Sequence, residues 1–260
     1  MQMAVVNLAA GQTVYSEAGK FLFCSDDVVI ETKPSQPDAP GQPQGQPAGA
    51  GGFGGLLRGA MDAGKRMLAG ESFAFQHFTT RGGDGLLALA GVLPGEMRVL
   101  ELDGATTWFA EKDAFVAAEA GVKFDIAFAG ARQGFSGGEG FVLEKFTGLG
   151  SLLIAGAGNF VDINPAEYGG RLRVDTGCVV AWDQNIRYGV ERVGSLNRQG
   201  VMNAVFGGEG LSLATLEGDG RVILQSMTID GLAKALAKNT GAGDKKTGAG
   251  MGGLFGGSAD

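Results

Sequence analysis

The sequence has very few of the residues that carry most catalytic and metal chemistry. Among 260 residues there is one histidine, His77, and there are two cysteines, Cys24 and Cys178. A single histidine forms no histidine cluster, and one histidine with two separate cysteines provides no zinc site. His77 is the one candidate base for a Ser-His-Asp triad, and we predict no such triad. Two isolated cysteines form no disulfide framework, which favours a reducing compartment. We therefore expect no enzyme activity, no catalytic residue, no cofactor and a cytoplasmic location.

Positive charge and long apolar runs are also scarce. Lys and Arg number 21 against 28 Asp and Glu, which gives a formal net charge of -7. Nucleic-acid binding depends on clustered positive charge, so we predict no nucleic-acid partner. The longest apolar stretch, residues 85–95, contains Pro94 and is shorter than the roughly 20 residues that span a membrane. We predict no transmembrane segment, and peripheral association with a membrane stays open.

Proline is rare except in one segment, whereas glycine is abundant throughout. Residues 34–55 hold five of the seven prolines, and four of them recur every three residues. That period is typical of a polyproline II strip that docks on a partner, and also of a plain solvent loop. The 48 glycines indicate tight turns between short strands. A short helix is predicted at about 56–68.

Two sets of segments recur three times along the chain. The first set, GESFAFQHFTT, GEGFVLEKFTG and GEGLSLATLEG, begins at Gly70, Gly138 and Gly208, and each segment is followed by a second apolar stretch. Glycine-rich turns between apolar runs predict a β-hairpin in each copy. Phe78 and its counterparts break the alternation of apolar residues, which predicts a β-bulge there.

The second set precedes the first in each copy. It consists of VYSEAGKFLF, WFAEKDAFVA and LRVDTGCVVA, which begin at Val14, Trp108 and Leu172. We interpret each as a hairpin, because an acidic residue precedes a turn-forming Gly or Asp in all three. The apolar trios after the turn, which begin at Phe21, Phe115 and Val179, are typical of strands buried on both faces.

These repeats predict an all-β fold of three small antiparallel β modules around a pseudo-threefold axis, with one or two short helices. The expected boundaries are residues 1–102, 103–166 and 167–230. Residues 231–260 are expected to form a short helix, beginning at Asp230 as the N-cap, and a glycine-rich tail.

The recurring acidic residues are the candidate ligand groups. A threefold arrangement can bring Glu71, Glu139 and Glu209 together, or alternatively Glu17, Glu111 and Asp175. Three converging carboxylates are typical of a site for a hard cation such as Ca²⁺ or Mg²⁺. The alternative is that each carboxylate accepts hydrogen bonds from the backbone beside its own turn.

Three other features have competing interpretations. His77 aligns with Lys145 and Thr215, which indicates a generic polar position rather than a catalytic one. Residues 59–66 resemble a P-loop, but Arg66 stands where Ser or Thr would bind Mg²⁺ and no strand precedes the segment. The similar motifs around Phe53 and Phe255 are candidate partner contacts, or parts of mobile segments.

Three stretches carry a resemblance to a known family. They are GEGFVLEKFTGLGSLLIAGAG, VDTGCVVAWDQNIRY and GESFAFQHF after KRMLAG. Over about residues 5–230 the chain resembles the Altered Inheritance of Mitochondria (number twenty-four) family of mitochondrial biogenesis proteins and their bacterial relatives of unknown function. The resemblance implies a fold similar to the tryptophan RNA-binding attenuation protein, a double-stranded β-helix variant. It also implies ring assembly, in which three copies of this chain would form one ring, and it supplies no catalytic residues.

Two functions therefore remain in competition. The first is a non-enzymatic, homo-oligomeric scaffold or interaction protein, with a trimer favoured, that can act near a membrane. The second is a module that binds a small ligand or cation on the axis of the repeat. An enzyme and a nucleic-acid binder follow behind these two.

Overall fold

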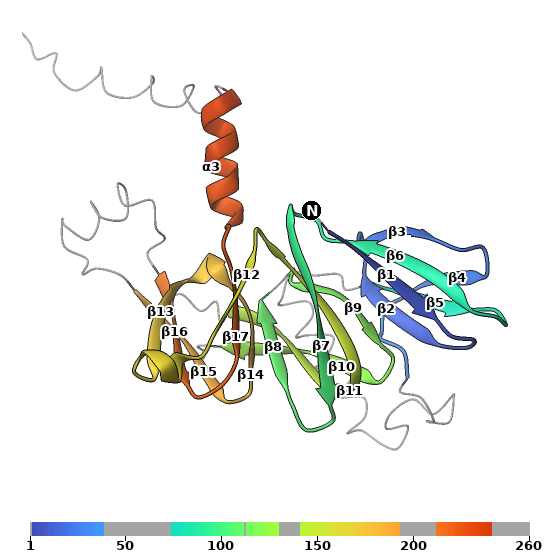
Figure 1. The fold of residues 1–260 in the computed structure, drawn as a ribbon, viewed down its shortest axis with the longest axis horizontal. Helices are drawn as coiled ribbons and strands as arrows, with labels where there is room; N and C mark the ends of the chain where they lie inside the picture. Colours follow the sequence, from blue (N-terminus) through green and yellow to red (C-terminus); the bar gives the residue numbers. More distant parts are fainter. Residues whose placement is uncertain (1, 39–73, 112, 130–140, 193–211, 241–260) are drawn as a thin grey trace, which may run out of the picture.

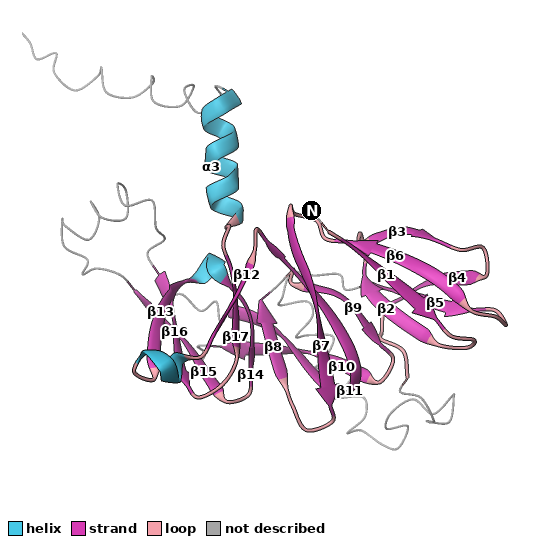
Figure 2. Ribbon diagram, in the orientation of Figure 1, coloured by secondary structure: helices cyan, strands magenta, loops and turns pink. Residues whose placement is uncertain are grey.

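The computed structural model describes residues 2–38, 74–111, 113–129, 141–192 and 212–240. Within these residues the protein is built almost wholly from β-strands, together with one α-helix and two 3₁₀ turns (Figure 2). All of the strand pairs are antiparallel, which confirms the expected all-β fold class. The helix predicted at 56–68 and most of the proline-rich segment lie outside the described residues.

The strands fall along the chain into three groups. Group one contains β1 (Met3–Leu8), β2 (Thr13–Glu17), β3 (Phe21–Cys24), β4 (Val28–Lys33), β5 (Phe75–Thr80) and β6 (Gly85–Ala90). Group two contains β7 (Gly95–Asp103), β8 (Trp108–Glu111), β9 (Phe115–Glu119), β10 (Val122–Ala129) and the long β11 (Phe141–Ala157). Group three contains β12 (Phe160–Ile163), β13 (Arg171–Asp175), β14 (Val179–Asp183), β15 (Ile186–Arg192), β16 (Ser212–Gly218) and β17 (Val222–Gln225). The 3₁₀ turns are η1 (Pro165–Tyr168) and η2 (Thr176–Cys178), and α3 (Ile229–Thr240) follows β17.

Most strand pairs within a group join strands that are not consecutive in the chain. In group one, β5 lies between β2 and β4, and β6 lies between β1 and β3. In group two, the first half of β11 pairs with β8 and β10, and its second half pairs with β7 and β9. In group three, β16 lies between β13 and β15, and β17 lies between β12 and β14.

Two further pairs connect the groups. Strand β2 pairs with β9, and β8 pairs with β14, so each group is joined to the next through its sheet. The three groups form a row along the long axis of the molecule and do not surround the pseudo-threefold axis that the repeats predict (Figure 1). Strand β3 lies in the group at one end of this row, and β13 lies in the group at the other end.

The prediction of a hairpin in each segment of both sets is wrong. Strands β2 and β3 pair with other strands and not with each other, and the same holds for β5 and β6. In group two the two expected strands are a single strand, β11, which bends at Gly148 and Gly150. Both glycines have positive φ, so the chain turns a corner between two layers of strands rather than folding back on itself.

The prediction of a β-bulge at Phe78 is also wrong. The register of β5 against β2 and β4 is continuous through Phe78, and Phe75 and Phe78 are both buried. Phe75 and Phe78 point to opposite faces of β5. Both are buried because each face packs against a different core cluster. The register shifts instead within β3, β9 and β14, where Leu22, Val116 and Val180 are the residues skipped.

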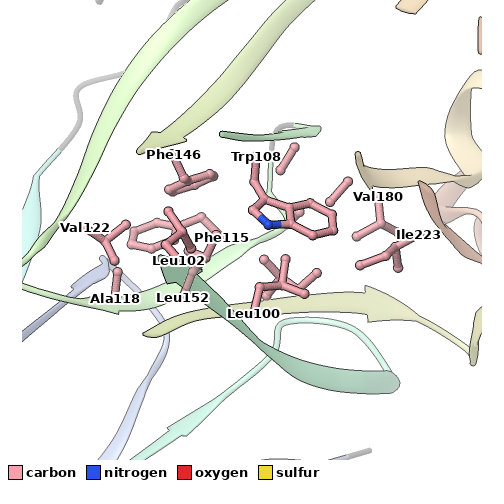
Figure 3. Packing of buried hydrophobic residues seen from close by; sticks show 14 of the residues in the cluster. Leu100, Leu102, Trp108, Phe115, Ala118, Val122, Phe146, Leu152, Val180 and Ile223 are labelled. Carbon is pink, nitrogen blue, oxygen red and sulfur yellow. The ribbon is translucent and has the colours of Figure 1, made fainter. Parts of the chain in front are cut away.

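The central core connects all three groups. It contains Tyr15 and Phe75 from group one, several residues of group two, and Val180, Ala181 and Ile223 from group three. Figure 3 shows Trp108 between Phe115 on one side and Val180 and Ile223 on the other. Because this core crosses the strand pairs that join the groups, it holds the row together.

The apolar trios behave differently in the three groups. Phe115, Val116 and Ala117 are buried, and so are the residues from Val179 to Ala181, as the sequence predicts. The trio in β3 departs from that prediction, because Leu22 is 50% exposed and Phe23 is 46% exposed. No described strand pairs with the outer edge of β3, so this trio is buried on one side only.

The C-terminal helix is confirmed, although its cap is not the expected one. Helix α3 begins at Ile229, and the Thr228 hydroxyl accepts a hydrogen bond from the Gly231 N–H at 3.0 Å. Thr228 is therefore the N-cap, and Asp230 lies in the first turn, where its charge favours the helix dipole. The helix extends away from the strands (Figure 1).

Candidate functional site

A cavity of about 900 Å³ opens between the strands and the beginning of α3. Its lining comes from all three strand groups and from the helix, and the charged members are Lys20, Glu111, Asp113, Asp175, Asp230 and Lys234. Small or apolar residues such as Ala114, Ala155, Gly156 and Val180 form much of the remaining wall. A concave, partly apolar cavity with a few converging charges is the usual form of a ligand site.

Lys20 is the buried cation of this cavity. Its side chain is 4% exposed, and its Nζ lies 3.3 Å from a carboxylate oxygen of Glu17. A buried ammonium group requires such a partner, because removal from water strongly disfavours an unpaired charge. Glu17 ends β2 and Lys20 lies in the turn before β3, in which Gly19 has φ 90°. The local turn thus fixes this ion pair at the cavity wall.

Glu111 is an acidic residue of the cavity wall whose pKa is raised. Burial raises the pKa of its carboxyl to about 7, and a hydrogen bond from the Tyr188 hydroxyl opposes that rise. The donor and acceptor oxygens are 3.2 Å apart. Tyr188 is held by stacking on Trp182, with ring centroids 4.5 Å apart, and its own pKa is raised by burial.

Glu144 lies buried beneath these groups on β11. Its side chain is almost fully enclosed, and its Oε2 has no hydrogen-bond partner. Burial raises the pKa of this carboxyl well above its ordinary value, and the nearby charges of Glu17 and Asp113 raise it further, whereas Lys20 lowers it. The burial of Glu144 therefore favours the protonated, uncharged form of its carboxyl.

Comparison with known proteins identifies the family. The family model described as mitochondrial biogenesis AIM24 matches residues 1–227 of the chain. The chain belongs to this family. An uncharacterized protein of Streptococcus pyogenes serotype M6 is 29% identical over 234 residues, which cover 90% of this chain and 84% of that protein. The resemblance found from the sequence motifs is thereby confirmed.

A solved structure is also similar to this AIM24-family chain. It is a crystal structure of a protein from Streptococcus pyogenes, with a TM-score of 0.64 and 24% sequence identity. The match covers 91% of this chain and 94% of that chain. At this identity the likeness shows a shared fold. The arrangement of strands is thus common to this chain and to that Streptococcus pyogenes protein.

The second acidic set from the sequence analysis is only partly brought together in this AIM24-family protein. Glu111 and Asp175 line the same cavity. Glu17 does not line it, but forms an ion pair with Lys20, which does. Asp175 also accepts a hydrogen bond from the Gly177 N–H at 2.9 Å, as the alternative of local backbone contacts predicts. In the described part of the chain, no group of three His, Cys, Asp or Glu residues is arranged to hold a metal ion.

Other candidates from the sequence cannot be placed or have structural roles. Glu71, Glu139 and Glu209 lie outside the described residues, as do Phe53, Phe255 and the P-loop-like segment 59–66. His77 is buried, with its Nε2 at 2.8 Å from the Ser35 carbonyl oxygen, so its position is not simply a polar surface. Burial lowers the pKa of its imidazole.

Sequence reasoning missed three residues of this site: Lys20, Glu144 and Tyr188. The repeat alignment contained a signal for two of them. Lys20 aligns with Ala114 and Cys178, and Glu144 aligns with Gln76 and Ala214, so each is a charge at a place where a counterpart is apolar. Tyr188 gave no comparable signal, because its role depends on stacking against Trp182.

Among the described residues, no helix combines the length and the apolar character needed to cross a membrane.

Proposed function

We propose that this protein is a non-enzymatic scaffold that assembles with copies of itself. The supporting observation is the end of the row at β3, where Leu22 and Phe23 expose large apolar side chains on an edge strand. Exposed apolar edges promote association, and proteins usually cover, charge or pair them. A trimer is the favoured assembly, and the cytoplasm is the proposed location.

The proposed architecture behind this function is a threefold repeat that forms a variant of the double-stranded β-helix. The pairs β2·β5, β8·β11 and β13·β16 support it, since each joins strands from corresponding repeat segments. The pairs β3·β6, β9·β11 and β14·β17 give the same support. A repeated unit suits a scaffold, because each unit offers its neighbour the same kind of edge.

Light scattering coupled to size exclusion tests the proposed assembly. The chain mass is 26.6 kDa, and we expect a particle at a multiple of this mass that dissociates on dilution. A particle that stays at the monomer mass from dilute to concentrated samples would overturn the proposal.

Two further experiments test the proposed partners. A pull-down with the full chain identifies other protein partners, including partners at a membrane surface. We propose no nucleic-acid role, and retention of RNA that depends on salt concentration would contradict this.

The second candidate function is binding of a small charged ligand or cation, and the cavity below α3 favours it. Acidic residues outnumber Lys20 and Lys234 on its wall, so a cationic group is the better match. Thermal-shift screening with Ca²⁺, Mg²⁺ and small cationic metabolites tests this function, because a ligand of the folded state raises Tm. Loss of the shift in Glu111→Gln is expected, and no shift with any of these ligands would contradict the idea.

A further inference from the structure

The two joints between strand groups have the same register. In the β2·β9 joint, Val14, Tyr15 and Ser16 lie opposite Glu119, Ala118 and Ala117. In the β8·β14 joint, Trp108, Phe109 and Ala110 lie opposite Asp183, Trp182 and Ala181. Val14 and Trp108 both begin the aligned segments of the sequence, so these two joints match residue for residue.

The backbone hydrogen bonds of the two joints match as well. The Ala120 N–H donates to the Thr13 carbonyl at 3.2 Å, and the Gln184 N–H donates to the Thr107 carbonyl at 3.0 Å. Hydrogen-bonded pairs alternate along an antiparallel ladder, so Tyr15·Ala118 and Phe109·Trp182 are also hydrogen-bonded pairs. The joint is thus a defined unit that the chain builds twice.

Each end of the row carries one of the two strand types that form this joint, without the other strand opposite it among the described residues. At the group-three end, β13 pairs with β16, and no described strand pairs with its outer edge. The Gly218 N–H donates to the Gly170 carbonyl at 3.1 Å, so alternation directs the N–H and C=O groups of Arg171 and Arg173 away from β16. Arg173 occupies the place of Tyr15 and Phe109 in the aligned segments.

The other half of the joint lies at the group-one end. The Ser25 N–H donates to the Leu86 carbonyl at 2.9 Å, and Cys24 lies opposite Leu87. Alternation then directs the N–H and C=O groups of Cys24 away from β6, toward the outer edge of β3. Cys24 occupies the place of Ala118 and Trp182 in the aligned segments.

We infer that β13 of one copy pairs with β3 of a second copy, in the register of the two internal joints. Leu172, Arg173 and Val174 then lie opposite Ser25, Cys24 and Phe23 of the second copy. This inference rests on the proposed self-assembly and adds the contacting strands, their direction and their register.

Apolar burial supports a second copy as the occupant of the β3 edge. The counterparts of Leu22 and Phe23 are Val116 and Ala117 in β9, and they are at most 2% exposed. Val116 and Ala117 pack in a cluster with Leu8, Val14 and Phe78 of the preceding group. A copy seated at β3 therefore covers the same places that the preceding group covers inside the chain.

Charge supports the same pairing. Extending the register by one residue places Arg171 opposite Asp26, in the places that Thr13 and Ala120 occupy in the first joint. Arg171 and Arg173 have partly exposed side chains at the β13 edge, where they form ion pairs with Glu191 and Glu217 of their own sheet. Asp26 and Asp27 follow β3, so the pairing adds an acidic neighbour to Arg171 and places no like charges opposite each other.

The pairing is head-to-tail, because the two edges differ and lie at opposite ends of the molecule (Figure 1). A head-to-tail interface repeats from copy to copy and forms a closed ring or an open filament. It does not stop at a two-fold dimer.

A disulfide between two different variants tests the register. The first variant is C178S, which keeps Cys24 as its one cysteine, and the second is C24S/C178S/R173C. Opposed residues of a hydrogen-bonded pair have Cα atoms about 5.5 Å apart, within the range that a disulfide requires. When the two are mixed and treated with diamide, we expect a reducible dimer that contains one chain of each variant, and none from either variant alone.

The matched control is R187C in the same C24S/C178S background. Arg187 is also an exposed arginine of the β13-β16-β15 sheet, but it lies on the far strand β15. A second pair, S25C with L172C, tests the neighbouring position and guards against a misfolded variant. Failure of both pairs to cross-link, or equal cross-linking through R187C, would overturn the inference. If light scattering still finds an assembly, the proposed scaffold stands and only this interface fails.

Discussion

Phe23 and Ala117 occupy the same place in two aligned strands, yet Phe23 is 46% exposed and Ala117 is 2% exposed. The difference follows from the strand opposite each residue. Ala117 lies opposite Ser16 of β2, whereas no described strand lies opposite the outer edge of β3. The same strand type therefore forms the core inside the row and an uncovered surface at its end.

This contrast predicts that matching substitutions in β9 and β3 differ in their effect on stability. Val116→Ser places a hydroxyl in a fully buried position, and we expect it to lower the free energy of unfolding by about 2–4 kcal/mol. Leu22→Ser should change the monomer by less than about 0.5 kcal/mol, because Leu22 is half exposed, but should weaken self-association. Urea denaturation and light scattering measure the two effects, and equal destabilisation by both variants would contradict the account.

Glu111 predicts a pH dependence of stability. Its pKa is raised by burial to about 7 from an ordinary value of 4.5, so the folded state holds its proton more tightly than the unfolded state. Stability attributable to Glu111 therefore falls as pH rises from about 4.5 to 7. Glu111→Gln removes this loss, and we expect it to be more stable than the wild type by about 1–3 kcal/mol at pH 8.

The control for this measurement is Glu167→Gln, which changes an exposed carboxylate on η1. Because its carboxylate is exposed to water, we expect its removal to change the free energy of unfolding little. The explanation of Glu111 is wrong if the two variants show the same pH profile in urea denaturation.

Lys20 is expected to be the most sensitive charge of the cavity. Lys20→Met removes the cation that faces Glu17 and that lowers the pKa of buried Glu144. Removal of one member of a buried pair typically costs about 3–5 kcal/mol, and we expect Lys20→Met to lower the free energy of unfolding by an amount in this range. Lys33→Met, which breaks an exposed pair with Glu31, should have a much smaller effect, because water solvates both charges. Similar losses in both variants would contradict a buried role for Lys20.

Gly218 is expected to tolerate no side chain. It ends β16 with φ 133°, and a Cβ there would overlap the Asn185 carbonyl oxygen. Gly218→Ala should therefore lower the free energy of unfolding by about 2–4 kcal/mol. Gly82→Ala, in an open turn where a Cβ meets no atom within 4 Å, should have almost no effect. Thermal unfolding distinguishes the two, and an equal Tm for both variants would refute the argument.

Much of the fold was predictable because periodic apolar residues report burial locally. The strands around Phe115 and Val179, the helix near Asp230 and the all-β class all follow from such patterns. Strand partners did not follow, because antiparallel partners such as β2 and β9 are far apart in the sequence. The glycine-rich links were interpreted as hairpin turns, whereas Gly148 and Gly150 bend one continuous strand.

The site was less predictable than the fold. Glu111 and Asp175 could be chosen because acidic residues recur at that place in the repeat. The burial of Lys20 and Glu144, and the stacking of Tyr188 on Trp182, depend on how the strand groups pack, which no local pattern encodes. For the same reason the exposed trio in β3 could not be distinguished from its buried counterparts.

Hydrogen–deuterium exchange at the Cys24 and Arg173 amides tests the central claim most directly. Both N–H groups point to outer strand edges in the single chain, and the proposed pairing makes both hydrogen-bonded in the assembly. The account predicts slow exchange at both amides in concentrated samples and fast exchange at both after dilution to monomers. Fast exchange at both amides in a sample that light scattering shows to be assembled would contradict it.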